Sequence, residues 1–154
     1  MKKVLIILLC GLSLSVAAAP FNAVVPIHDK GAQTFYVEGK LGSLDATEFM
    51  LDTGSGYLVI NQQSLTQLKE NGQAGYVKDI KGILANGDEF VVPVWRIASM
   101  TINDQCILRN VEAAVFPGKT RQILGLTALK KAAPFIVSFD PPQIVFSHCT
   151  RTES

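Results

Sequence analysis

The sequence predicts one all-β domain with one or two short helices. Short runs of β-prone residues follow one another along most of the chain, and glycines separate many of them. Two short stretches have a helical pattern instead. The length of 154 residues suits a single domain, and a hydrophobic content of 48% is sufficient for its core.

The first half of the chain contains four expected strands and one expected helix. The strands are short runs rich in aliphatic and aromatic residues, at positions 23–27, 34–38, 48–51 and 57–60. Residues 64–70 have apolar residues at helical spacing, and Asn71-Gly72 provides a stop signal after them.

A long hairpin is expected in the middle of the chain, with strands at residues 76–84 and 89–97. Its connection contains Asn86-Gly87, the preferred central pair of a type I′ turn, because both residues of that pair need positive φ. The remaining elements are two strands, a short helix and a closing hairpin, at residues 100–102, 111–116, 127–132 and 135–146.

The N-terminus has the three parts of a secretory signal peptide. A positively charged start, Met1-Lys2-Lys3, precedes an apolar stretch and an Ala-rich exit, and cleavage is expected near residues 17–19. The apolar stretch is shorter than the roughly 20 residues of a membrane-spanning helix, although an uncleaved signal would act as an anchor. The alternative is a buried first helix or strand. We therefore expect a signal peptide at residues 1–19, a domain at residues 20–154 and export to the bacterial periplasm.

Composition and spacing also limit the classes of partner and cofactor. The net charge is +1 and no basic block is present, which argues against nucleic acid or an acidic membrane as a partner. His28 and His148 lie far apart in sequence and do not form a metal-ligand pattern, so we expect no metal and no cofactor. Export would leave Cys106 and Cys149, which can form a disulfide or remain as two buried thiols.

One motif carries the functional signal. Residues 50–56 read MLDTGSG, so an apolar strand leads to the carboxylate of Asp52, and the glycines let the chain turn sharply beside it. The alternative is an ordinary turn in which Asp52 accepts hydrogen bonds from nearby amides. A second signature, two apolar residues and a glycine, precedes the last expected helix: Ile123, Leu124 and Gly125.

These two signatures, with the long hairpin between them, resemble those of the retroviral-type (retropepsin-like) aspartic proteases, in a branch exported by bacteria. The resemblance extends from about residue 35 to residue 146. It implies a closed or partly closed β-barrel in which the Ile-Leu-Gly strand packs across the loop of the catalytic aspartate. It also implies that the hairpin is the flap that covers the substrate.

The resemblance further implies roles for individual residues. The catalytic motif would be Asp52, Thr53 and Gly54, with Thr53 hydrogen-bonded across a two-fold axis and Gly54 letting amides approach the carboxylate. Ser55 would bind substrate and would donate a hydrogen bond to the outer oxygen of Asp52. The flap tip, which would also contact substrate, consists of Ala85, Asn86 and Gly87. The terminal segments, near residues 23–27 and 143–146, would interdigitate with those of a second copy.

The chemistry of such a site requires two carboxylates, whereas the chain contains one Asp-Thr-Gly. An ionised carboxylate removes a proton from the attacking water, and a protonated one polarises the scissile carbonyl. At a separation of ~3 Å and an effective dielectric constant of about 20, two carboxylates repel by roughly 5 kcal/mol, or about four pK units, so they retain one shared proton. We therefore expect an aspartic endopeptidase, active on proteins or peptides, that is a homodimer with two Asp52 side chains in one site. The alternative is a catalytically inactive periplasmic peptide-binding or scaffold module of the same fold.

Overall fold

The computed structural model describes residues 21–83, 87 and 89–150. The predicted signal peptide and the flap-tip residues Ala85 and Asn86 lie outside the described residues. Within the described ranges no helix is long and apolar enough to cross a membrane. The elements are, in chain order, β1 (Ala23–Pro26), β2 (His28–Asp29), β3 (Phe35–Leu41), β4 (Thr47–Leu51), β5 (Leu58–Asn61), α1 (Gln62–Glu70), β6 (Ala74–Ile83), β7 (Glu89–Ile102), β8 (Cys106–Phe116), β9 (Ile123–Leu124), α2 (Leu126–Leu129), β10 (Phe135–Phe139) and β11 (Pro142–Phe146).

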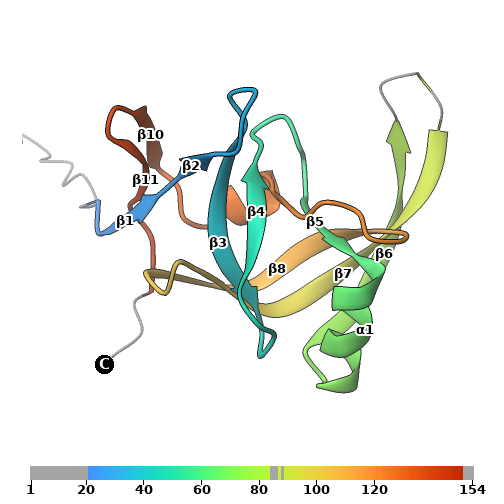
Figure 1. The fold of residues 1–154 in the computed structure, drawn as a ribbon. Helices are drawn as coiled ribbons and strands as arrows, with labels where there is room; N and C mark the ends of the chain where they lie inside the picture. Colours follow the sequence, from blue (N-terminus) through green and yellow to red (C-terminus); the bar gives the residue numbers. More distant parts are fainter. Residues whose placement is uncertain (1–20, 84–86, 88, 151–154) are drawn as a thin grey trace, which may run out of the picture.

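The larger of two sheets closes on itself. Its strand order is β2-β3-β4-β9-β5-β8-β7-β6, and β3 also pairs with β7 through Gly39 and Ile102. The strands from β3 to β7 in that order therefore form a ring, to which β2 and β6 are attached (Figure 1). This confirms the prediction of a partly closed all-β barrel with short helices.

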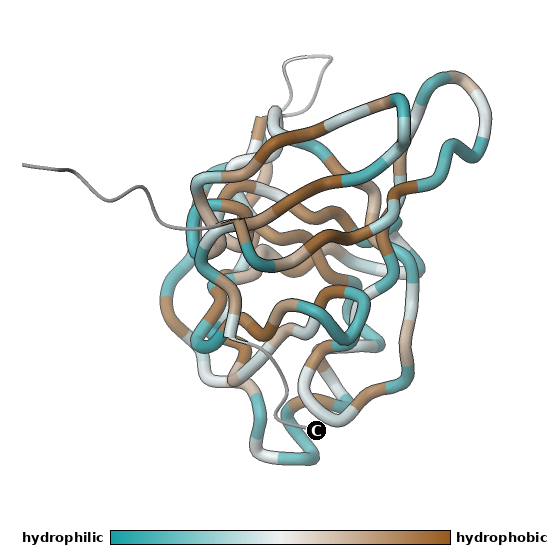
Figure 2. The backbone as a smooth tube through the Cα atoms, turned by 90° about the vertical axis from the view of Figure 1, so that its left-hand side faces the viewer, coloured by the Kyte–Doolittle hydropathy of each residue, from teal (hydrophilic) through white to brown (hydrophobic). Residues whose placement is uncertain are grey.

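The core of the barrel is filled by one face of each strand. Side chains alternate between faces along a strand, and the inward residues Val37, Phe49, Ile97 and Leu124 are fully buried. Apolar segments run through the interior of the fold, and hydrophilic segments gather in the peripheral loops (Figure 2). Burial of each large apolar side chain stabilises the fold by about 1.5–3 kcal/mol. The buried Phe49 therefore keeps one face of β4 in the core, and the residues on the other face remain accessible.

The helix α1 begins and ends at recognisable signals. The Asn61 side chain accepts a hydrogen bond of 2.9 Å from the amide of Ser64 and so caps the first turn. Leu65 and Leu68 are buried against the barrel. Gly72 has φ of +65°, a conformation that ends helices and favours glycine. The helix begins two residues earlier than predicted because its cap is Asn61.

The predicted central hairpin is present as β6 and β7. These strands pair from Ala74–Ile97 to Ile83–Glu89, and the far part of the hairpin extends beyond the body of the barrel (Figure 1). β7 continues without a break to Ile102, where we expected a separate strand at residues 100–102. It is continuous because β8 pairs with it along most of its length.

The second sheet contains both terminal segments, in the order β1-β11-β10. Val145 of β11 pairs with Val24 of β1 on one side and with Ile136 of β10 on the other. Both neighbours of β11 thus come from its own chain. The predicted interdigitation of the terminal strands with those of a second copy stays a prediction, and within one chain the outer edges of this sheet are β1 and β10.

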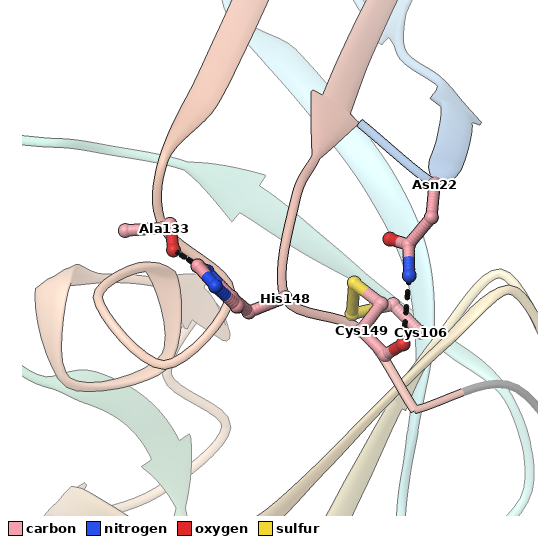
Figure 3. Close-up of a disulfide and its surroundings, with 5 residues drawn as sticks. All are labelled: Asn22, Cys106, Ala133, His148 and Cys149. Carbon is pink, nitrogen blue, oxygen red and sulfur yellow. Dashed lines mark hydrogen bonds between the residues drawn. A yellow bond between two sulfur atoms is a disulfide. The ribbon is translucent and has the colours of Figure 1, made fainter. Parts of the chain in front are cut away.

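A disulfide connects the barrel to this second sheet. Cys106 at the start of β8 is bonded to Cys149, which follows β11, and both are buried (Figure 3). Asn22 Nδ2 donates to the Cys149 carbonyl at 3.1 Å, and the Ile107 amide donates to the Thr150 carbonyl at 2.9 Å. The end of the terminal sheet is therefore attached to β8 both covalently and by hydrogen bonds.

Removal of the disulfide by Cys106→Ala/Cys149→Ala should lower the free energy of unfolding by about 4 kcal/mol. This is the chain-entropy value for a sequence separation of 43 residues. Urea denaturation of the two proteins, each with and without a thiol reductant, measures the change. The reductant should destabilise the wild-type protein and leave the double variant unaffected. Equal midpoints for all four samples would contradict the stabilising role.

Candidate active site

Asp52 lies directly after β4, at the point where β9 joins the barrel. β9 pairs in parallel with β4, with Leu51 opposite Leu124, and the Asp52 amide donates to the Leu124 carbonyl at 3.2 Å. On its other side β9 pairs antiparallel with β5 through Val59. The loop of residues 52–57 is thus spanned by the strand that the Ile-Leu-Gly signature predicted.

The Asp52 carboxylate is oriented by its own loop. The Gly54 amide donates to Asp52 Oδ1 at 2.8 Å. A Cβ atom at position 54 would lie 3.0 Å from the same oxygen, closer than such atoms normally approach. Gly54 therefore lets the backbone reach the carboxylate without crowding it. Asp52 is partly exposed and Thr53 is exposed.

Ser55 makes a different hydrogen bond from the one that we expected. Its hydroxyl donates to the carbonyl of Tyr57 at 2.8 Å. A hydroxyl has a single proton to donate, so in this chain Ser55 does not donate to the outer oxygen of Asp52. The reason is local: the carbonyl of Tyr57 is two residues away in the same turn, and the bond closes the loop on itself.

Gly125 allows the second signature to cross the loop at contact distance. A Cβ atom at position 125 would lie 2.0 Å from the Tyr57 carbonyl oxygen and 2.9 Å from the Ser55 carbonyl oxygen. The next residue, Leu126, donates its amide to the Ser55 carbonyl at 2.9 Å. Because the obstacles are backbone atoms, no side chain at position 125 can be accommodated by rotation of a neighbour.

Thr127 in α2 also holds the loop, and sequence analysis missed it. Its hydroxyl accepts from the Leu58 amide at 2.7 Å and donates to the Glu112 carbonyl at 2.6 Å. One side chain therefore joins the end of the Asp52 loop to β8. The available signal was a hydroxyl residue in the first turn of a helix just after the Ile-Leu-Gly signature, where such groups often bind backbone.

The partly exposed face of β4 carries Glu48 and Met50, because residues two apart point to the same side, and Asp52 follows the strand directly. Arg121, which sequence analysis also missed, places Nη1 3.4 Å from Met50 Sδ. Farther along the strand, hydrogen bonds from Lys30 and His28 hold the pKa of the Glu48 carboxyl below its usual value. Charged groups therefore lie beside the strand that leads to Asp52.

The strands of the predicted flap contact the site region. Phe90 of β7 packs edge-on against Phe116 at a centroid distance of 5.4 Å and covers Gly82 of β6. Lys78 Nζ lies 5.9 Å from the centroid of the Tyr57 ring. Gly87, the one described residue of the predicted tip, is exposed with φ of +90°, a value that favours glycine. Among the described residues no three His, Cys, Asp or Glu side chains are arranged to hold a metal ion.

Residues 37–131, which include both signatures, match the model of a family described as "gag-polyprotein putative aspartyl protease". The chain belongs to this aspartyl protease family. A solved structure of a retropepsin-like aspartic protease from Rickettsia conorii matches with a TM-score of 0.55 and 18% sequence identity, covering 80% of this chain and 96% of that chain. That likeness confirms the retropepsin-like fold. No curated protein sequence matches the chain.

In this member of the aspartyl protease family, Gly125→Ala should destabilise the fold by about 3 kcal/mol or more, because the new methyl group overlaps the backbone of Tyr57. Gly56→Ala, in the same loop, is the matched control, since an added Cβ atom there meets nothing within 4 Å. Thermal and urea denaturation of both variants measure the difference. Equal stability of the Gly125→Ala and Gly56→Ala variants would show that the backbone at position 125 is not in close contact with the loop.

Thr127→Val should cost about 1–3 kcal/mol of stability, because the amide of Leu58 and the carbonyl of Glu112 both lose their partner while the side-chain shape is kept. Thr127→Ser retains the hydroxyl and should recover most of this loss. Urea denaturation of the two variants provides the comparison. A Ser variant as unstable as the Val variant would assign the role to the methyl group instead.

Proposed function

We propose that the protein is an aspartic endopeptidase that acts as a homodimer, with water activated between two Asp52 side chains. The observation that carries the proposal is the placement of a partly exposed Asp52 carboxylate on a loop held by β9 and α2. Membership of the aspartyl protease family supports the choice of peptide hydrolysis over other uses of a carboxylate.

The proposed reaction needs no covalent intermediate. The ionised carboxylate takes a proton from water, and the water oxygen attacks the scissile carbonyl carbon while the second, protonated carboxyl donates to the carbonyl oxygen. The tetrahedral intermediate then collapses, the C–N bond breaks, and the leaving nitrogen receives a proton. Since the chain has one Asp-Thr-Gly, the second carboxyl group would come from Asp52 of another copy.

The second sheet is the proposed contact between the copies. Its outer edges, β1 and β10, each have one neighbouring strand among the described residues. Val24 and Ile136 on these strands are 53% and 51% exposed, so both edges present apolar side chains to solvent. Edge-to-edge pairing of this sheet with that of a second copy would use the free backbone groups and cover part of this apolar surface.

Export to the periplasm is part of the proposal. The pairing of Cys106 with Cys149 supports an oxidising compartment, where disulfides persist. The predicted signal peptide at residues 1–19, followed by the domain at 20–154, would supply the route. N-terminal sequencing of protein recovered from the periplasm tests both points, and a mature start near residues 18–20 is the expected result.

Asp52→Asn should lower kcat/KM on a mixed peptide library by about 10³-fold or more, because neither water activation nor carbonyl polarisation survives the loss of the acid. Light scattering should find the variant and the wild-type protein equally dimeric. Asp45→Asn, outside the Asp-Thr-Gly motif, is the matched control and should retain activity. Full activity of Asp52→Asn would rule out the proposal, and uptake of peptides by the wild-type protein without cleavage would favour the inactive binding module.

The pH dependence of kcat/KM should be bell-shaped. The working dyad carries one proton, so activity falls when pH drops and the second carboxylate becomes protonated, and falls again when the shared proton is lost at higher pH. Initial rates across the acidic and neutral range give the two apparent pKa values of the pair. A profile with a single ionisation would argue against a shared proton.

A further inference from the structure

An arginine lies beside the strand that leads to Asp52. Met50 pairs with Ile123, so their side chains share one face of the sheet, and Asp52 follows two residues after Met50. Arg121 precedes Ile123 by two residues, and its Nη1 lies 3.4 Å from Met50 Sδ. The guanidinium is therefore one side chain away from the strand that delivers the candidate catalytic carboxylate.

This guanidinium has no acidic partner within the described ranges. The ion pairs found there involve other cations: His28, Lys30, Lys40, Lys81 and Arg96. The thioether of Met50 is a weak acceptor, whereas a guanidinium has five N–H donors. Arg121 is exposed. Most of its donors are thus directed to solvent or to a ligand rather than to the protein.

The positive charge near Arg121 is not neutralised by the carboxylate of Glu48. Glu48, on the same face of β4, already hydrogen-bonds to Lys30 and, at 2.9 Å, to His28. Across the loop, Lys78 lies over the ring of Tyr57 and also has no acidic partner in the described part of the chain. Two cations, on β6 and before β9, therefore border the Asp52 loop.

We propose that Arg121 is a specificity-determining residue, and that the proposed active site selects peptides with a glutamate side chain next to the scissile bond. The proposal rests on the endopeptidase function given above. The two methylene groups of glutamate match the apolar surface of Met50 and Ile123, and its carboxylate would accept charge-assisted hydrogen bonds from Arg121. In a two-fold symmetric dimer, one such subsite would lie on each side of the scissile bond.

The test compares pairs of peptides that differ only by Glu or Gln at the residue before or after the scissile bond. At pH 6, where the free glutamate side chain with its pKa of about 4.3 is ionised, wild-type kcat/KM should be about tenfold higher for the Glu peptide, as expected for a hydrogen bond to a charged group. The preference should shrink at high ionic strength and at a pH below 4. Binding of the same peptides to Asp52→Asn provides a readout that does not require turnover.

Arg121→Gln should abolish the preference by lowering kcat/KM on the Glu peptide about tenfold, and Arg121→Glu should shift the preference toward Lys at that position. Arg109→Gln is the matched control, because Arg109 is an exposed arginine in a separate pocket with Lys131 and His148, and it should leave the preference unchanged. Cleavage without a Glu preference, or an unchanged preference in Arg121→Gln, overturns this inference and leaves the endopeptidase function standing. No cleavage of any peptide, with equal binding of Glu and Gln peptides, overturns both.

Discussion

The contact between Gly125 and the loop of residues 52–57 is the constraint on which the rest of the site depends. It brings two strands that are far apart in sequence, β4 and β9, into parallel pairing, and it leaves no room for a side chain between them. The polar backbone groups of the loop are then satisfied by this crossing segment: the Asp52 amide by Leu124, the Ser55 carbonyl by Leu126. Together with the Gly54 amide, which donates to Asp52 Oδ1, these bonds restrict the orientation of the carboxylate, and such preorganisation would favour catalysis.

The strand β4 serves the core and the site at once because a strand has two faces. Phe49 is fully buried in the barrel, whereas Met50 is partly exposed beside Arg121. A shift of one residue in the register of β4 would exchange these faces, so the burial of Phe49 also determines where Asp52 points. For the same reason Glu48 can lie on the partly exposed face of β4 without disturbing the packing of the interior.

Local patterns were sufficient to predict the parts of the structure that depend on near neighbours in sequence. The strand before Asp52, the turn glycines after it, the central hairpin and the stop of α1 at Gly72 all belong to this class. The pairing of β3 with β7, which closes the ring, joins segments about sixty residues apart and has no local signal. Ser55 and Thr127 illustrate the same limit for side chains, because a hydroxyl chooses among acceptors that only the folded loop brings near. The pairing of β1 with β11 shows the same limit: both strands were predicted, but nothing local in the sequence showed that they pair within one chain.

The terminal sheet and the site are parts of one connected unit. Ser147, directly after β11, donates its amide to the carbonyl of Pro134 at 3.0 Å, and His148 hydrogen-bonds through its ring to Ala133, in the segment that follows α2 (Figure 3). One residue later, Cys149 is bonded to Cys106 of β8, and β8 also supplies the carbonyl of Glu112 that receives the Thr127 hydroxyl. A force on the terminal sheet would therefore reach α2 and β8, the two elements that Thr127 joins beneath the loop. In the proposed dimer, the surface that brings two copies together would in this way be mechanically linked to the loop that each copy contributes, so correct pairing and correct orientation of Asp52 would depend on the same set of bonds.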